Sequence, residues 1–290
     1  MGRSVWQSPP WHIRRTGFPE AWRLVRMERV QYRPVEVGLL DSGVDLKHPY
    51  LRHLLGPGIN LLSPGKPPQD EHGHGTHIAG ILAVASGALQ RERPVWPPPL
   101  RIRPVKIFDR KGVGRIADIV AGLRWCLEQG CEIVNLSFGT DRQASEQLAR
   151  AIRTLDRHGI LLVGAAGNDG RAGSVDTPGV YPEVVAVAAS NRRDRLARFS
   201  SRGPEVDLVA PGTGLFSLLP GGAFGYMSGT SMAAPHVTAA AALLLQVRPG
   251  LGPAAIRARL KATAEWLPEV PVSAQGAGLL RADRLLRAEV

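Results

Sequence analysis

The stretch VEVGLLDSG, residues 35–43, decides the fold class. Its apolar residues are nearly continuous rather than strictly alternating, which predicts a strand covered on both faces, as in a parallel sheet flanked by helices. Runs of the same β-rich kind follow at residues 102–108, 132–138, 160–167 and 184–190. Stretches with helical periodicity, several of them closing on glycine, lie at residues 117–130, 145–159, 231–246 and 253–267. This alternation predicts an α/β fold with a mostly parallel central sheet.

We expect one domain over residues 1–290. The chain has 290 residues, of which 44% are hydrophobic and 21% charged, a composition in the ordinary globular range. Two proline-rich segments, at 63–69 and 91–101, interrupt the pattern, but strands and helices resume after each. We therefore interpret these segments as surface connections rather than domain linkers.

The net charge of +11 comes from 36 basic and 25 acidic residues. The arginines are scattered from Arg3 to Arg287 instead of gathering beside aromatic residues, as they do in nucleic-acid binders. We expect no nucleic-acid partner. The alternative, a basic nucleic-acid-binding protein, predicts DNA association that appears at low salt and persists at physiological salt.

Neither a secretory signal nor a membrane-spanning run is recognisable by eye in the sequence. The two cysteines, Cys126 and Cys131, give no disulfide framework and are expected to be free thiols. These features favour the cytoplasm and predict no membrane partner, while the oligomeric state is left open.

Asp41 directly follows the strand predicted at 35–40, and functional side chains in such sheets gather at the carboxyl ends of strands. An aspartate before Gly43 is also a common turn former, so Asp41 alone does not identify a site.

HGHGTHIAGILAVA, residues 72–85, predicts a helix that begins near His74, with Gly73 and Gly75 permitting close backbone approach. A zinc site built from His72, His74 and His77 is the alternative. No acidic or cysteine partner at a known zinc spacing accompanies these histidines, so acid–base chemistry is favoured.

GTSMAAPH, residues 229–236, places Ser231 in the first turn of a long apolar helix. A hydroxyl at a helix start commonly caps the unpaired N–H groups there, but the same N–H groups can stabilise a developing oxyanion. Asn168 follows the strand at 160–167 and can donate from its amide. Asp, His, Asn and Ser at element ends, in this chain order, favour an acyl-transfer site.

DSGVD, HGTHIAG, AAGN and GTSMAAPH, at residues 41–45, 74–80, 165–168 and 229–236, resemble the signature blocks of the subtilisin family of serine proteases. The similarity runs from WHIRRTGFPEAW to GAGLLRADRLL, almost the whole chain. It implies the family's single-domain, three-layer fold.

The resemblance implies a serine endopeptidase, a peptide hydrolase with a catalytic triad. Ser231 would attack the peptide carbonyl, His74 would take and return the proton, and Asp41 would orient the imidazolium. Asn168 and the Ser231 N–H would hold the oxyanion, with Thr230 in support. A catalytically silent peptide-binding protein of the same fold is the alternative.

The family binds polypeptide substrates as an added strand between two edges, followed by a pocket for the residue on the acyl side of the cut. Asp176 would lie at the floor of that pocket and favour Arg or Lys there, although a solvated loop aspartate is the competing interpretation. The positions that match are Gly112, Val113, Gly114, Ser137, Phe138 and Gly139 for the edges, and Phe138, Gly164, Ala165, Ala166 and Asp176 for the pocket.

Departures from the family concern calcium and the pro-segment. Tyr50 stands where a carboxylate ligand is usual, and residues 85–99 replace a ligand-rich loop. Since calcium takes six to eight oxygens, we expect no high-affinity site of the usual kind and no required cofactor, with room only for a weak cation site near Val180 and Asp207. Only 40 residues precede Asp41, which favours the family's intracellular type with a short or no pro-segment.

Overall fold

The computed structural model describes residues 8–28, 33–89, 99–140 and 145–287. Seven strands form one sheet in the order β2-β3-β1-β4-β5-β6-β7, and every pair in it is parallel. Two further strands, β8 and β9, make an antiparallel hairpin. The strand bounds are β1 Val35–Asp41, β2 Ile59–Asn60, β3 Leu100–Lys106, β4 Ile133–Leu136, β5 Leu161–Ala165, β6 Val184–Ser190, β7 Val206–Pro211, β8 Leu215–Leu219 and β9 Ala223–Met227.

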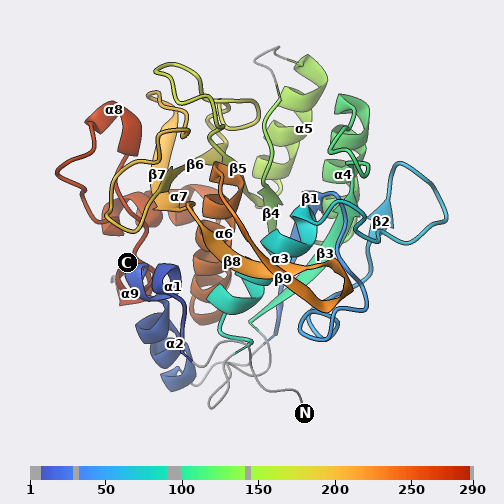
Figure 1. Cartoon of the computed structure of the whole chain (residues 1–290), viewed down its shortest axis with the longest axis horizontal. Coiled ribbons are helices and arrows are strands. Elements are labelled where there is room, and N and C mark those ends of the chain that lie inside the picture. The colour runs from blue at the N-terminus through green and yellow to red at the C-terminus, as the bar shows by residue number, and fades with distance from the viewer. Residues whose placement is uncertain (1–7, 29–32, 90–98, 141–144, 288–290) are drawn as a thin grey trace.

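Helices cover both faces of the sheet (Figure 1). Helix α6 lies across the middle strands together with α3, while α4 and α5 pack side by side on the opposite face. The helix bounds are α1 Trp11–Arg15, α2 Phe18–Met27, α3 His74–Ala85, α4 Ile116–Glu128, α5 Glu146–Arg157, α6 Thr230–Val247, α7 Pro253–Thr263, α8 Val272–Gln275 and α9 Ala282–Arg287.

Strand β1 contributes side chains to the hydrophobic cores on both faces of the sheet. Val37 and Leu39 point into the core shared with α3 and α6, whereas Leu40 points into the core beneath α4 and α5. Successive side chains of a strand alternate between faces, so a sheet covered on both sides requires apolar residues at nearly every position. This confirms the predicted α/β fold and its three layers.

Helix α6 is buried along its whole length. It is long and apolar enough to cross a membrane by those criteria alone, which the inspection of the sequence missed, but 94% of it is buried inside the protein. An apolar helix surrounded by protein is the core helix of a globular fold.

The predicted strands and helices all form, within a few residues of the expected bounds. The run predicted at 184–190 coincides with β6, and the helix predicted at 253–267 ends earlier, at Thr263. The expectations did not include β2, β7, the β8–β9 hairpin, or the short helices at the two ends of the chain.

Candidate active site

Asp41, His74 and Ser231 meet where three different elements begin or end. Asp41 is the last residue of β1, His74 the first of α3, and Ser231 the second of α6. All three line one cavity of about 270 Å³ at the carboxyl edge of the sheet. The loops and helix starts at that edge therefore assemble side chains that are 33 and 157 positions apart in the sequence.

The Asp41 carboxylate is buried and aimed at His74. Its two oxygens lie 2.8 and 3.0 Å from His74 Nδ1, and the Ser42 N–H donates to Asp41 Oδ1 over 2.8 Å. With the proton on Nδ1, the other ring nitrogen of His74, Nε2, is an acceptor. A carboxylate that fixes the tautomer in this way prepares the ring as a general base.

The pKa of His74 lies above its ordinary value. Burial lowers it, but the charge and hydrogen bond of Asp41, with a smaller contribution from the charge of Asp70, outweigh that effect. A base with a raised pKa holds a proton more firmly once it has accepted one.

Among the described residues, no hydrogen bond joins the His74 ring to the Ser231 hydroxyl. The two groups nevertheless face the same cavity. Catalytic hydrogen bonds are often long in a free enzyme and tighten when substrate binds.

Asn168 and Thr230 are joined at the start of α6. Asn168 Oδ1 accepts the Thr230 N–H over 3.0 Å and the Thr230 hydroxyl over 3.2 Å, and Thr230 Oγ1 in turn accepts the Gly167 N–H over 3.0 Å. Because its oxygen is engaged, the Asn168 amide presents its NH₂ as a donor. No group among the described residues accepts the Ser231 N–H, which leaves a second donor at the same helix start.

A buried polar chain also fixes the backbone of Ser231. The Ser137 hydroxyl donates to the Ser231 carbonyl, Asn135 donates to Ser137, and the Thr238 hydroxyl donates to Asn135, each over 2.8 Å. The sequence did not single out Asn135 or Thr238, because a polar residue inside an apolar run shows its partner only once the chain is folded.

The expected substrate edges are brought to the cavity in part. Gly112, Ser137, Phe138 and Gly139 line it, whereas Val113 is 62% exposed beside it. The other expected edge residue, Gly114, packs against Phe108 instead.

The cavity wall includes two rings that the sequence reasoning did not place there, those of Phe108 and His72. Phe108 contacts Phe138 edge to face with ring centroids 5.2 Å apart, and the His72 and His74 rings lie 6.2 Å apart in the same arrangement. The cue for Phe108 was its position as the last residue of the run predicted as a strand at 102–108.

Asp176 is not among the residues that line the cavity, and its carboxylate lies against two glycines, of which Gly139 does line it. A methyl group built on Gly139 or Gly167 would come within 2.3 or 2.4 Å of Asp176 Oδ2. Its backbone N–H donates to the Ala166 carbonyl over 2.9 Å. Of the expected wall residues, Ala165 and Ala166 are buried, and Gly164 packs against Val184 away from this carboxylate. Gly167, which the sequence reasoning did not place in the pocket wall, contacts the carboxylate of Asp176 instead.

The histidines considered as zinc ligands do not converge. His77 is buried on α3, and its Nε2 lies 3.1 Å from the Leu215 carbonyl. Within the described residues, no group of three or more His, Cys, Asp or Glu is arranged to hold a metal.

The position where the family usually has a calcium-ligating carboxylate is held here by Tyr50. Tyr50 packs its ring against Phe224 and His48, so an aromatic cluster occupies the place of a carboxylate. Much of the 85–99 segment lies outside the described residues. Asp207 forms an ion pair with Lys261 and accepts the Ala186 N–H over 2.9 Å, so a cation there would have to displace an ammonium group. The weak cation site stays a prediction.

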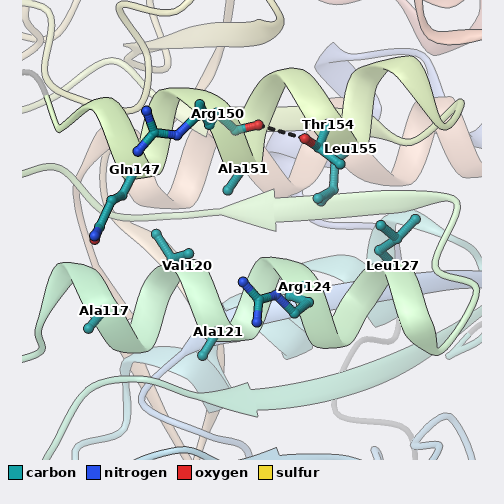
Figure 2. Close-up of a pocket in the computed structure, with 10 residues that line it drawn as sticks. All are labelled: Ala117, Val120, Ala121, Arg124, Leu127, Gln147, Arg150, Ala151, Thr154 and Leu155. Carbon is teal, nitrogen blue, oxygen red and sulfur yellow. Dashed lines mark hydrogen bonds between the residues drawn. The ribbon is translucent and has the colours of Figure 1, made fainter.

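A larger hollow than this cavity lies elsewhere in the described part of the chain. It measures about 560 Å³ and runs between α4 and α5, with an apolar floor and the side chains of Arg124 and Arg150 along it (Figure 2). It contains no carboxylate, histidine or activated hydroxyl: its one hydroxyl, on Thr154, donates to the Arg150 carbonyl over 2.8 Å. The chemistry therefore belongs to the smaller cavity.

Comparison with known proteins agrees with this geometry. The model of the subtilase family matches residues 33–282. Subtilisin from Bacillus pumilus is 38% identical over 236 residues, covering 80% of this chain and 84% of that protein. Subtilisin Savinase from Lederbergia lenta is 36% identical over 282 residues, covering 97% of this chain and all of that protein. Subtilisin E from Bacillus subtilis is 38% identical over 236 residues, and the match spans 61% of its length.

Proposed function

Because this chain belongs to the subtilase family and is a subtilisin-like serine endopeptidase, we propose that Ser231 is its nucleophile and that it prefers Arg or Lys on the acyl side of the cut. The observation that carries the nucleophile is the convergence of Asp41, His74 and Ser231 on one cavity. The Asn168 oxygen accepts the N–H of Thr230, the residue before Ser231, so the Asn168 NH₂ is available as a hydrogen-bond donor.

In the proposed reaction, Ser231 Oγ attacks the substrate carbonyl while His74 Nε2 takes its proton. The resulting imidazolium is held by the buried charge of Asp41, 2.8 Å from Nδ1. The carbonyl oxygen becomes an oxyanion between the Asn168 NH₂ and the Ser231 N–H, and fixed donors stabilise such charge better than mobile water does. His74 then protonates the leaving amine, and water repeats the sequence on the acyl-enzyme.

Replacement of the nucleophile tests this assignment. We expect Ser231→Ala to abolish hydrolysis of a peptide substrate and to leave the thermal unfolding midpoint nearly unchanged, because the side chain loses one oxygen at a cavity wall. A fluorophosphonate probe should label Ser231 in the folded wild type. Absence of labelling in folded protein would favour a silent peptide binder.

The proposed preference for basic residues is supported by the position of Asp176. Its carboxylate contacts Gly139, which lines the cavity, and Gly167, which precedes the oxyanion donor Asn168. A substrate side chain that passes between these glycines would meet a negative charge. Partial burial strengthens an ion pair relative to water, since the effective dielectric constant is lower.

Hydrolysis of matched peptides with Arg or Phe before the scissile bond tests the preference. We expect Asp176→Ala to lower the Arg-to-Phe ratio of kcat/KM at least tenfold, mainly through the Arg peptide. Asp169→Ala, which removes an exposed carboxylate from the same loop, is the matched control and should leave the ratio unchanged. An unaltered ratio in Asp176→Ala would refute the preference.

We also propose that catalysis needs no metal, because the triad and its donors supply nucleophile, base and oxyanion stabilisation. An intracellular location is the remaining part of the proposal. The buried thiols of Cys126 and Cys131 are compatible with a reducing compartment. Fractionation of cells that express the protein, followed by probe labelling of each fraction, tests the location.

A further inference from the structure

Asp70 is a buried carboxylate that the reaction above does not use. It lies in the loop before α3 and is 3% exposed. Its Oδ1 accepts the Ser42 hydroxyl over 2.9 Å and the N–H groups of His72 and Gly73 over 2.9 and 2.8 Å. Its Oδ2 accepts the N–H and the hydroxyl of Thr76 over 2.9 and 2.5 Å. Five donors thus converge on one side chain.

These bonds join the segments that carry two triad members. Ser42 follows Asp41, and its hydroxyl also accepts the Gly75 N–H over 3.0 Å. Thr76 lies in the first turn of α3, and its hydroxyl accepts the Asp45 N–H over 3.0 Å. The loop after β1 and the start of α3 are therefore tied to each other through Asp70.

The start of α3 depends on this arrangement because its own cap is glycine. Gly73 is the residue before the helix, with φ of 102°, and it has no side chain to accept an N–H. The first N–H groups of a helix need acceptors, and a carboxylate there is also favoured by the helix dipole. Asp70 and Ser42 supply those acceptors for Thr76 and Gly75, directly beside His74.

Asp70 also belongs to the electrostatic environment of His74. Burial lowers the pKa of His74, and the negative charges of Asp41 and Asp70 raise it. A cation close to the His74 ring would oppose them, but the ammonium group of Lys106 on β3 is turned toward the Ser42 and Gln69 carbonyls at 2.9 and 3.0 Å. The titratable groups around His74, from β1, the preceding loop, α3 and β3, are Asp41, Asp70, Glu71, His72, His77 and Lys106.

We propose that Asp70 is a positioning residue of the peptidase, which holds the first turn of α3 against the Asp41 loop and provides a second negative charge for the His74 imidazolium. This inference rests on the proposed function. Asp70 does not touch substrate; it acts through His74. Both roles predict an effect on kcat rather than on substrate binding.

The test compares Asp70→Asn with wild type across pH. The amide keeps the shape but loses the charge and turns an NH₂ toward backbone N–H groups. We expect kcat to fall ten- to a hundredfold, since small misplacements of a catalytic group have effects of that size, with KM within twofold of wild type. The acid limb of the kcat/KM profile should move to lower pH, because removal of a negative charge lowers the pKa of His74. Titration of the His74 ring by NMR in inactive Ser231→Ala protein reads the same shift without turnover.

Asp45→Asn is the matched control. Asp45 is 6% exposed in the neighbouring loop, and its carboxylate accepts the Gly221 and Lys47 N–H groups rather than those of α3. The Asp45→Asn substitution should leave the acid limb of the kcat/KM profile at the pH of the wild type. Equal acid limbs in wild type, Asp70→Asn and Asp45→Asn would overturn the inference while leaving Ser231 as nucleophile intact, because wild type is active in the same assay.

Milder variants keep the proposal testable if Asp70→Asn does not fold. Thr76→Val and Ser42→Ala each remove one hydroxyl that donates to Asp70 and leave its charge in place. We expect each to lower kcat severalfold with the acid limb unmoved. Unchanged kcat in both would overturn the positioning role.

Discussion

Acidification should destabilise the folded protein through its buried histidines. His77 and His236 are fully buried, and burial is the main reason that the pKa of each is lowered to about 4. In the unfolded chain a histidine titrates near 6.5. Between these values the unfolded state binds more protons than the folded state, so stability falls as pH falls through this window.

The size of the effect follows from the two pKa values. One pH unit is worth about 1.36 kcal/mol per proton, so each imidazole costs about 2 kcal/mol between pH 7 and pH 5. His77 and His236 together cost about 4 kcal/mol. His12 adds in the same sense, because burial and its neighbour His236 hold its pKa well below the ordinary value. His74 works in the opposite direction, since its raised pKa makes its contribution fully present below the unfolded value.

Calorimetry of the Ser231→Ala protein, which is expected not to digest itself, measures this cost. An unfolding entropy of about 2.1 cal/mol/K per residue gives about 0.6 kcal/mol/K for 290 residues. A loss of 4 kcal/mol therefore lowers the midpoint by about 6 to 7 °C between pH 7 and pH 5. In a His77→Gln background the same change of pH should lower it about 3 °C less.

His158→Gln is the control for that comparison, because His158 lies exposed at the end of α5 and should not alter the pH dependence. The contribution of His74 is common to every variant and largely cancels. Equal midpoints at pH 7 and pH 5 would refute the reasoning, as would a His77→Gln protein with the full shift of its parent.

Three further outcomes follow from the site and its surroundings. Asn168→Ala should lower kcat by about 10² to 10³ with little change in KM, the range found when a subtilisin loses one oxyanion donor; steady-state kinetics checks it, and a loss confined to KM would contradict it. Glu265→Gln should cost about 2 kcal/mol, or about 3 °C by calorimetry, because Glu265 accepts charged hydrogen bonds from Arg15 and Arg281; an unchanged midpoint would show that the network adds nothing. A chelator should change neither activity nor midpoint, since Tyr50 replaces the usual carboxylate ligand; a lowered midpoint restored by calcium would reveal a site.

Strands that are buried on both faces were readable from the sequence because their apolar character is continuous. The run at 184–190 became β6 residue for residue. Strand β7 escaped notice because Asp207 interrupts it and Pro211 ends it, and its place at the edge depends on pairing with β6. Strand β2 has only two residues and forms only because β3 offers it an edge.

The residues that we propose to react could be predicted from the sequence for a different reason. Asp41, His74 and Ser231 stand at the ends of predictable elements, and signature residues surround them. The residues that hold these three side chains in place could not be predicted from the sequence. Asn135 and Thr238 form a hydrogen bond although they are 103 residues apart in the sequence, and Lys106 and the Ser42 carbonyl are 64 residues apart. No local sequence pattern therefore predicts either contact.

This difference has a physical origin in the parallel sheet. Each strand delivers one side chain or loop to the carboxyl edge, and the groups delivered there are polar, so each needs a partner that water no longer supplies. Asp70 meets that need for the start of α3, Lys106 for the Ser42 and Gln69 carbonyls, and Asn135 for Ser137. The buried polar groups between the helices and strands therefore hold the side chains of the site in position. Substitutions of these groups should lower the rate of the reaction even where the fold is retained.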